Sequence, residues 1–230
     1  MSVAQAPVCN GGSCFYYVGA SQAGITATGA VVSITQAQPV VGASDSHSLT
    51  ELAVESADGQ QIVEVGWIVA QAVNGDSAPH LFVFHWVNGV ASCYNACGFV
   101  STPGTFTVGQ TLPVGVVGKF TIHHSTKGWI TLYNGSQFGY FPNSLWGGTF
   151  TNPSLVQIFG EVASSPTAPP TSQMGNGILG SSTSLALIKS FSLEGSVNTP
   201  ALSPYLVGDA TIYNYGFATS TGLHYGDSGH

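Results

Sequence analysis

Charged side chains are scarce in this sequence. Its 230 residues include three lysines (Lys119, Lys127 and Lys189) and no arginine, and only 6% of the chain is charged. An average globular protein has about 25% charged residues. With three lysines and a formal net charge of −7, the chain cannot assemble a basic patch, which argues against a nucleic-acid partner.

Long apolar runs and helical patterns are also missing. No apolar run approaches the roughly 18 residues of a membrane-spanning helix, so we expect no membrane partner. No signal peptide opens the chain, so a secreted protein would be present here in its mature form. His80 and His85 would point to opposite faces of a strand, and the cysteine spacings are unusual for zinc. We therefore expect no metal and no cofactor.

The shortage of cations has a consequence in acid. Acid unfolding comes largely from protonating carboxylates that are paired in the native state. Three lysines allow few such pairs, and with seven histidines they leave few positive charges to repel one another at low pH. The composition is therefore typical of an acid-stable, secreted extracellular protein. A neutral extracellular surface without adaptation to acid is the alternative.

Hydrophobic residues are abundant, at 43% of the chain with 11% aromatics, which is ample for a packed core. The pattern is of alternating strands separated by turn residues, including Asn-Gly pairs at 74–75, 88–89, 134–135 and 176–177, of the kind that hairpins prefer. We expect strands near 14–18, 23–34, 48–55, 61–70, 80–87, 98–101, 106–108, 117–124, 128–134, 137–141, 155–163, 184–194 and 211–217, with one helical turn at 143–146. This predicts one all-β domain over 1–230, an antiparallel β-sandwich of two large sheets, with a closed barrel as the alternative.

The four cysteines form two close pairs, Cys9 with Cys14 and Cys93 with Cys97. An even number in short local pairs is typical of proteins from oxidising compartments. We predict two disulfides.

Two glutamates interrupt apolar strands. Glu64 lies within 61–69 and Glu161 within 155–162, and both runs are otherwise mostly apolar or β-branched. A carboxylate in such a run must have a partner, be neutralised or face a cleft, because burying it bare is costly. Its strand alternation puts Glu64 on the face opposite Val63, Val65 and Trp67, with Gly66 leaving room beside it.

In the second run, one face of the predicted strand has both polar and aromatic side chains: Gln157, Phe159 and Glu161. Such a face is typical of a cleft lining, so Gln157 is a candidate for substrate binding. Two carboxyl groups on neighbouring or facing strands can take different catalytic roles: one activates a water molecule, and the other protonates a leaving group. The alternative is that each glutamate lies at a solvent-exposed sheet edge or accepts a hydrogen bond from a backbone amide.

Seven segments, in order, resemble the neprosin family of glutamic endopeptidases. Each has a family counterpart: Ile62-Val-Glu-Val-Gly-Trp67, Leu81-Phe-Val-Phe-His-Trp86, Cys93-Tyr-Asn-Ala-Cys-Gly-Phe99, Gly139-Tyr-Phe-Pro142, Phe159-Gly-Glu161, Ser172-Gln-Met-Gly-Asn-Gly177 and His224-Tyr-Gly226. The match covers about 48–226, while 1–45 match loosely. The region 101–128 is shorter than in plant members, and the plant C-terminal cysteines are missing.

The resemblance implies a two-sheet sandwich, catalytic roles for Glu64 and Glu161, and cleavage in acid, often after proline. Candidate substrate-binding residues are Gln157, Gln173, Tyr140 and Trp67. We expect a protein or peptide substrate and a monomer. Two alternatives stay open at this point: a sandwich-type glycoside hydrolase, which also uses two carboxylates, and a non-catalytic lectin-like or adhesive sandwich.

Overall fold

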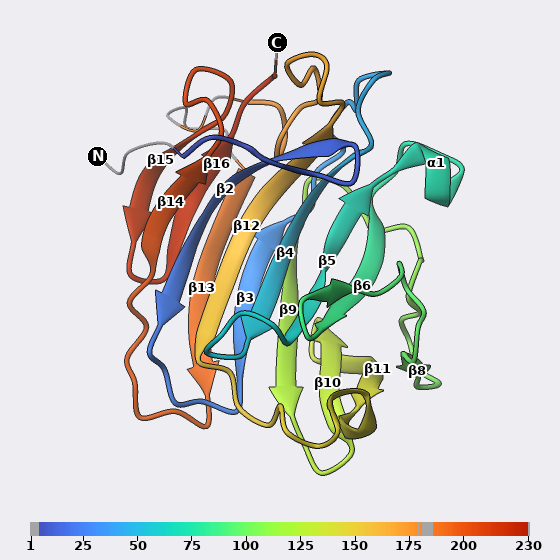
Figure 1. The fold of residues 1–230 in the computed structure, drawn as a ribbon, viewed down its shortest axis with the longest axis vertical. Helices are drawn as coiled ribbons and strands as arrows, with labels where there is room; N and C mark the ends of the chain where they lie inside the picture. Colours follow the sequence, from blue (N-terminus) through green and yellow to red (C-terminus); the bar gives the residue numbers. More distant parts are fainter. Residues whose placement is uncertain (1–4, 179, 181–185, 230) are drawn as a thin grey trace.

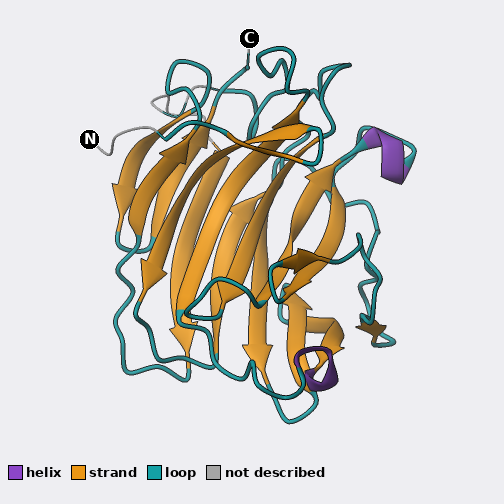
Figure 2. Ribbon diagram, in the orientation of Figure 1, coloured by secondary structure: helices purple, strands orange, loops and turns teal. Residues whose placement is uncertain are grey.

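Two antiparallel sheets face one another across the core (Figures 1 and 2). The computed structural model describes residues 5–178, 180 and 186–229. Within that part of the chain nearly all regular structure is strand, as the alternating sequence pattern predicts. The all-β sandwich fold is confirmed.

The first sheet is 8-stranded, in the order β1-β2-β12-β4-β5-β6-β7, with β14 also pairing with β2. Figure 1 shows most of its strands side by side toward the viewer. Its strands are β1 (Val8–Asn10), β2 (Ser13–Ala23), β4 (His47–Glu55), β5 (Ile62–Val69), β6 (His80–Val87), β7 (Val90–Ala91), β12 (Leu155–Ser164) and β14 (Ser203–Val207).

The second sheet is also 8-stranded, in the order β15-β16-β13-β3-β9-β10-β11-β8. Its strands are β3 (Gly29–Thr35), β8 (Val100–Ser101), β9 (Val117–His124), β10 (Gly128–Tyr133), β11 (Ser136–Pro142), β13 (Ala186–Glu194), β15 (Asn214–Thr219) and β16 (Gly222–Gly226). The predicted hairpin at Asn134-Gly135 joins β10 to β11, and both turn residues have positive φ.

The main core lies between the sheets and is built from one side of each strand. On β5, the side chains of Val63, Val65 and Trp67 are each 0% exposed. The Trp67 indole donates its N–H to the Thr35 carbonyl (3.0 Å), which satisfies its one polar atom. Because strand side chains alternate, this packing turns the Glu64 side of β5 away from the core.

Helical structure is confined to two single turns, α1 (Gln71–Asn74) and η1 (Asn143–Trp146), the second at the predicted place. Each ends at a glycine in the left-handed region, Gly75 (φ 84°) and Gly147 (φ 59°), where a side chain would be strained. Among the described residues, no helix is long and apolar enough to cross a membrane.

Both predicted disulfides are present, Cys9–Cys14 and Cys93–Cys97. The first links β1 to β2, where the two cysteines are directly paired residues. The second closes a tight loop between β7 and β8. The first bond therefore fastens the short strand β1 to β2, and the second stabilises a loop without regular structure.

Several strand bounds differ from the sequence pattern. The strands β6 and β9 have the predicted bounds, but β2 continues to Ala23, and β3 begins only at Gly29. Residues 106–108 form no strand, while β1, β7, β14 and β16 were not predicted. Residues 184–185 of one predicted strand lie outside the described part of the chain.

Candidate active site

A cleft lies on the face of the first sheet that points away from the main core. Its cavity of about 630 Å³ is lined from β2, β12, β4, β5, β6 and β14. The strand alternation that buries Leu52 and Val54 of β4 in the core turns Glu51, Ala53 and Glu55 toward this cleft.

Glu64 and Glu161 both line the cleft. Glu161 on β12 is paired with Leu49 of β4, and Glu64 on β5 is paired with Ala53 of β4. The two glutamates therefore lie on either side of β4. The expectation of neighbouring or facing strands was wrong, because β4 lies between their strands in a single sheet. Both side chains nevertheless point into the same cleft, as the alternation of side chains along the two strands predicted.

Glu161 forms an ion pair with His47, which the sequence did not single out. The distance from His47 Nε2 to Glu161 Oε1 is 2.7 Å, with side chains 17% and 12% exposed. His47 Nδ1 in turn lies 3.2 Å from the Ser46 hydroxyl. His47 begins β4, and Ala163, paired with it, lies two residues beyond Glu161 on β12. A histidine in this place fixes the carboxylate and supplies a charge-assisted hydrogen bond when protonated.

Glu64 has a different environment. Burial, and then the negative charge of Glu161, raise the pKa of Glu64 to about 8. The Trp86 indole N–H donates to Glu64 Oε1 (3.0 Å), an interaction that opposes the rise. The neutral acid is therefore the favoured form of Glu64 in acid and near neutrality.

Two further acids line the cleft, Glu51 and Glu55, both on β4 and 3% and 5% exposed. Burial raises the pKa of Glu55, although the Gln157 amide donates to its carboxylate (2.5 Å). Burial raises the pKa of Glu51 well above its ordinary value, and the charges of Glu64, Glu161 and Glu55 add to this. Four glutamates thus share one cleft.

Apolar and aromatic side chains form the rest of the lining. A second buried cluster, separate from the main core, lies beneath and beside the carboxyls: Leu49, Ala53, Ile68, Ala70, Phe82 and Phe159. Tyr17 packs edge-on against Phe159, and burial together with the charge of Glu161 raises the pKa of Tyr17, which keeps its hydroxyl neutral. The cleft therefore combines a mostly apolar lining with a group of acids.

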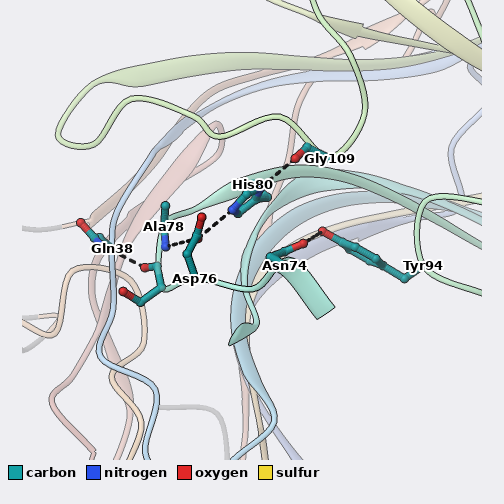
Figure 3. A network of polar contacts seen from close by, with 8 residues as sticks. Gln38, Asn74, Asp76, Ala78, His80, Tyr94 and Gly109 are labelled. Carbon is teal, nitrogen blue, oxygen red and sulfur yellow. Dashed lines mark hydrogen bonds and ion pairs between the residues drawn. The ribbon is translucent and has the colours of Figure 1, made fainter. Parts of the chain in front are cut away.

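The network in Figure 3 fixes one end of the cleft around α1. The Tyr94 hydroxyl donates to Asn74 Oδ1 (2.9 Å), and His80 Nε2 lies 2.9 Å from Asp76. His80 Nδ1 contacts the Gly109 carbonyl (2.7 Å). Ala72, Val73 and Tyr94 line the cavity, so these bonds position part of its wall.

Three of the expected substrate-binding residues do not line the cleft, whereas Gln157 does. Trp67 is wholly buried in the main core, because it shares a face with Val63 and Val65. Tyr140 lies on β11 of the opposite sheet. Gln173 binds the backbone of Val40 through both its main chain and its side chain. The structure therefore does not bring Trp67, Tyr140 and Gln173 to this cleft.

His80 and His85 have side chains on opposite faces of β6, as alternation requires. His80 pairs with Asp76, whereas His85 packs on Phe141 and Trp146 in the core. Within the described part of the chain, no group of three or more histidine, cysteine or acidic side chains is arranged to hold a metal ion.

Comparison with known proteins gives a family and a fold. The Neprosin family model matches residues 44–225. A crystal structure of scytalido-glutamic peptidase with a transition state analog inhibitor matches at 10% identity, TM-score 0.56, covering 92% of this chain and 97% of that chain. A search of curated proteins finds no match.

Two further structures match less well. SCP-B, a member of the Eqolisin family of peptidases in complex with a tripeptide, has 11% identity, TM-score 0.44, and coverage of 91% of this chain and 96% of its own. A Bacteroides ovatus GH16 protein in complex with a glucan product has 10% identity, TM-score 0.39, and coverage of 69% of this chain and 71% of its own.

Proposed function

The chain belongs to the Neprosin family, and from this premise we propose that it is a glutamic endopeptidase that hydrolyses peptide bonds with Glu161, Glu64 and one water molecule. The observation that carries the proposal is the pair of unlike glutamates on the floor of one cleft. Glu161 has a histidine partner that is cationic when protonated, and Glu64 is desolvated and favours its proton. Such a difference is what acid and base catalysis require of two carboxyls.

Glu161 is the base in this mechanism. A protonated His47 donates to its carboxylate at 2.7 Å, which orients Glu161. The ionised carboxylate takes one proton from a water molecule, and the water oxygen attacks the carbonyl carbon of the peptide bond. His47 thus acts as a positioning residue.

Glu64 is the acid. Its raised pKa keeps it protonated while Glu161 is ionised. When the tetrahedral intermediate collapses, the C–N bond breaks and the leaving nitrogen takes the proton of Glu64. The products are a carboxylic acid and an amine, and the enzyme is left with its proton on Glu161 rather than on Glu64. A return of that proton restores the starting state.

The substrate side of the proposal is a protein or peptide chain bound as an extended segment along the cleft, by a monomeric enzyme. Phe82, Phe84 and Trp86 of β6 provide an apolar wall beside Glu64. Such a wall fits proline and other uncharged side chains, so cleavage after proline belongs to this proposal. Secretion and action in acid also belong to it, supported by the two disulfides and the shortage of cations.

The experiment that tests this function is digestion of a proline-containing, glutamine-rich peptide and of a mixed-linkage glucan, at acid pH, with fragments identified by mass spectrometry. Peptide cleavage that is insensitive to pepstatin and to chelators supports the proposal. Cleavage of the glucan alone would support the glycoside hydrolase alternative, and no cleavage of either would support a binding protein.

A further inference from the structure

Glu51 occupies the position between the two proposed catalytic glutamates. On β4 it is paired with Phe159 of β12 on one side and with Gly66 of β5 on the other. Glu161 is paired with Leu49, two residues before it, and Glu64 with Ala53, two residues after it. Diagonal neighbours of this kind have Cα atoms about 7–8 Å apart. Glu51 is therefore the diagonal neighbour of both.

Local packing keeps Glu51 in this place. A Cβ atom on Gly66 would lie 2.8 Å from Glu51 Cβ, so glycine is needed for β5 to pass beside it. Glu51 is only 3% exposed, but it lines the cavity. Its small exposed surface therefore faces the space that a bound substrate would occupy. In the described part of the chain, no hydrogen bond from a side chain or loop backbone reaches its carboxyl group.

The charges around Glu51 are mainly negative. Glu161 faces it from β12, Glu64 from β5 and Glu55 from its own strand. Tyr17 of β2 and Tyr205 of β14 also lie within electrostatic reach, and both favour their neutral forms because of burial. His47, which is cationic when protonated, is bound to Glu161.

Three carboxyls in a row cannot all be ionised in a desolvated cleft. The middle one faces both of the others, so its ionisation is opposed from both sides, in line with the raised pKa of Glu51. A neutral carboxyl has an O–H donor, which a carboxylate lacks. A buried carboxylic acid that stays neutral can stabilise a developing oxyanion in this way.

We propose that Glu51 is a third catalytic carboxyl, a permanently protonated acid that donates a hydrogen bond to the oxyanion formed between Glu161 and Glu64. This rests on the proposed function and deepens it. Glu51 keeps its proton through the cycle, whereas Glu161 and Glu64 exchange theirs. The Glu51 carboxyl thus acts only as a hydrogen-bond donor, and the N–H group of a side-chain amide at this position can do the same.

The test compares Glu51→Gln with Glu51→Leu. Gln keeps a neutral donor of the same size, and Leu keeps volume but has no donor. On the peptide substrate, we expect Glu51→Gln to retain kcat within about tenfold of wild type, and Glu51→Leu to lose about 10²–10³-fold in kcat with little change in KM. Thermal melting of both variants checks that they are folded.

Two kinetic outcomes would overturn the inference. Equal activity of Glu51→Leu and wild type would show that no donor is needed at this position. A Glu51→Gln variant as inactive as Glu64→Gln would show that Glu51 exchanges protons, as an acid–base group or relay, instead of acting as a fixed donor.

A second measurement does not depend on catalysis. Infrared difference spectra at pH 6 should show a protonated carboxyl band in wild type that Glu51→Gln reduces, while the control Glu194→Gln, on a carboxyl that is 38% exposed, leaves it unchanged. An unchanged band in Glu51→Gln would contradict the inference. If wild type cleaves no peptide, the proposed function fails, and the band still decides whether Glu51 is a neutral acid.

Discussion

At the scale of single residues, the site depends on how differently the protein treats chemically identical side chains. Glu161 has a histidine partner, and Glu64 has an indole donor and little solvent. Glu51 has only carboxyls and neutral groups around it. Their environments, and not their residue type, distinguish the proposed base, acid and donor.

Trp86 provides a test of the acid. Its N–H bond to Glu64 lowers the pKa of that carboxyl, against the larger effect of burial. Trp86→Phe removes this hydrogen bond, so the pKa of Glu64 should rise further. We expect the alkaline limb of the pH–rate profile to move to higher pH, with the acid limb unchanged. An alkaline limb that stays in place, or moves to lower pH, would contradict the assignment of Glu64 as the acid.

His85 is a buried residue whose pKa is lowered by burial, whereas burial raises the pKa of Glu64. It is 3% exposed, its Nδ1 atom has no hydrogen-bond partner among the described residues, and burial lowers its pKa. A histidine that folds in its neutral form loses stability as pH falls below its unfolded pKa of about 6.5. Replacement by Phe should leave the melting temperature at pH 8 nearly unchanged and raise it at pH 4. Equal shifts at both pH values would show that the effect is packing alone.

The sequence allowed part of this residue-level account. Glu64 and Glu161 are detectable because each interrupts an apolar run. Glu51 and Glu55 escaped notice because they alternate with apolar residues along β4, the ordinary pattern of a strand with one wet face. The pairing of His47 with Glu161 spans 114 residues, and a local pattern carries no sign of such a contact.

At the scale of elements, β4 organises the site. It holds Glu51 and Glu55, begins with His47, and separates the strands of the two proposed catalytic residues. The sequence predicted this strand well, but not its position in the sheet, because strand order is set by long-range pairing. The strands β14 and β16 were missed because they are short, and β2 was cut short because glycine and serine interrupt its apolar pattern.

The loop closed by Cys93–Cys97 positions Tyr94, which stacks on Phe82 (ring centroids 6.3 Å apart) and binds Asn74. Opening so short a loop costs about 2 kcal/mol in chain-entropy terms. We expect Cys93→Ser/Cys97→Ser to lower the melting temperature by several degrees and to raise KM more than it lowers kcat, since Tyr94 forms part of the cleft wall and is not one of the proposed catalytic groups. The double variant Cys9→Ser/Cys14→Ser serves as the control. Loss of kcat alone would show that the loop has another role.

At the scale of the whole molecule, the cleft acids link stability to pH. Glu51, Glu55 and Glu64 all have raised pKa values in the folded protein. Carboxyls of this kind stabilise the fold fully below their unfolded pKa of about 4.3, and that contribution is lost as pH rises through the folded values. Three buried carboxyls act in this direction. Buried His85 and the exposed Asp58 and Asp76, whose pKa values are lowered, act against them. Because solvent screens the exposed groups, the buried carboxyls should dominate the pH dependence of stability.

Unfolding by urea at pH 4 and at pH 8 should therefore show greater stability in acid. Replacing Glu51 and Glu64 together by Gln removes two of the titrating groups and should flatten the pH dependence, while Glu194→Gln should leave it unchanged. Greater stability of wild type at pH 8 would contradict the raised pKa values in the cleft.

The central claim is that Glu161 and Glu64 are the base and the acid of a peptide hydrolase, and a pH–rate profile of wild type, Glu64→Gln and Glu161→Gln on one peptide tests it most directly. Wild type should cleave in acid and lose activity as pH rises through the raised pKa of Glu64. Both variants should fold and lose about 10²–10⁴-fold in kcat, because an amide cannot exchange the proton. Full activity in either variant, or a wild-type rate that increases above pH 8, would contradict the two-glutamate mechanism.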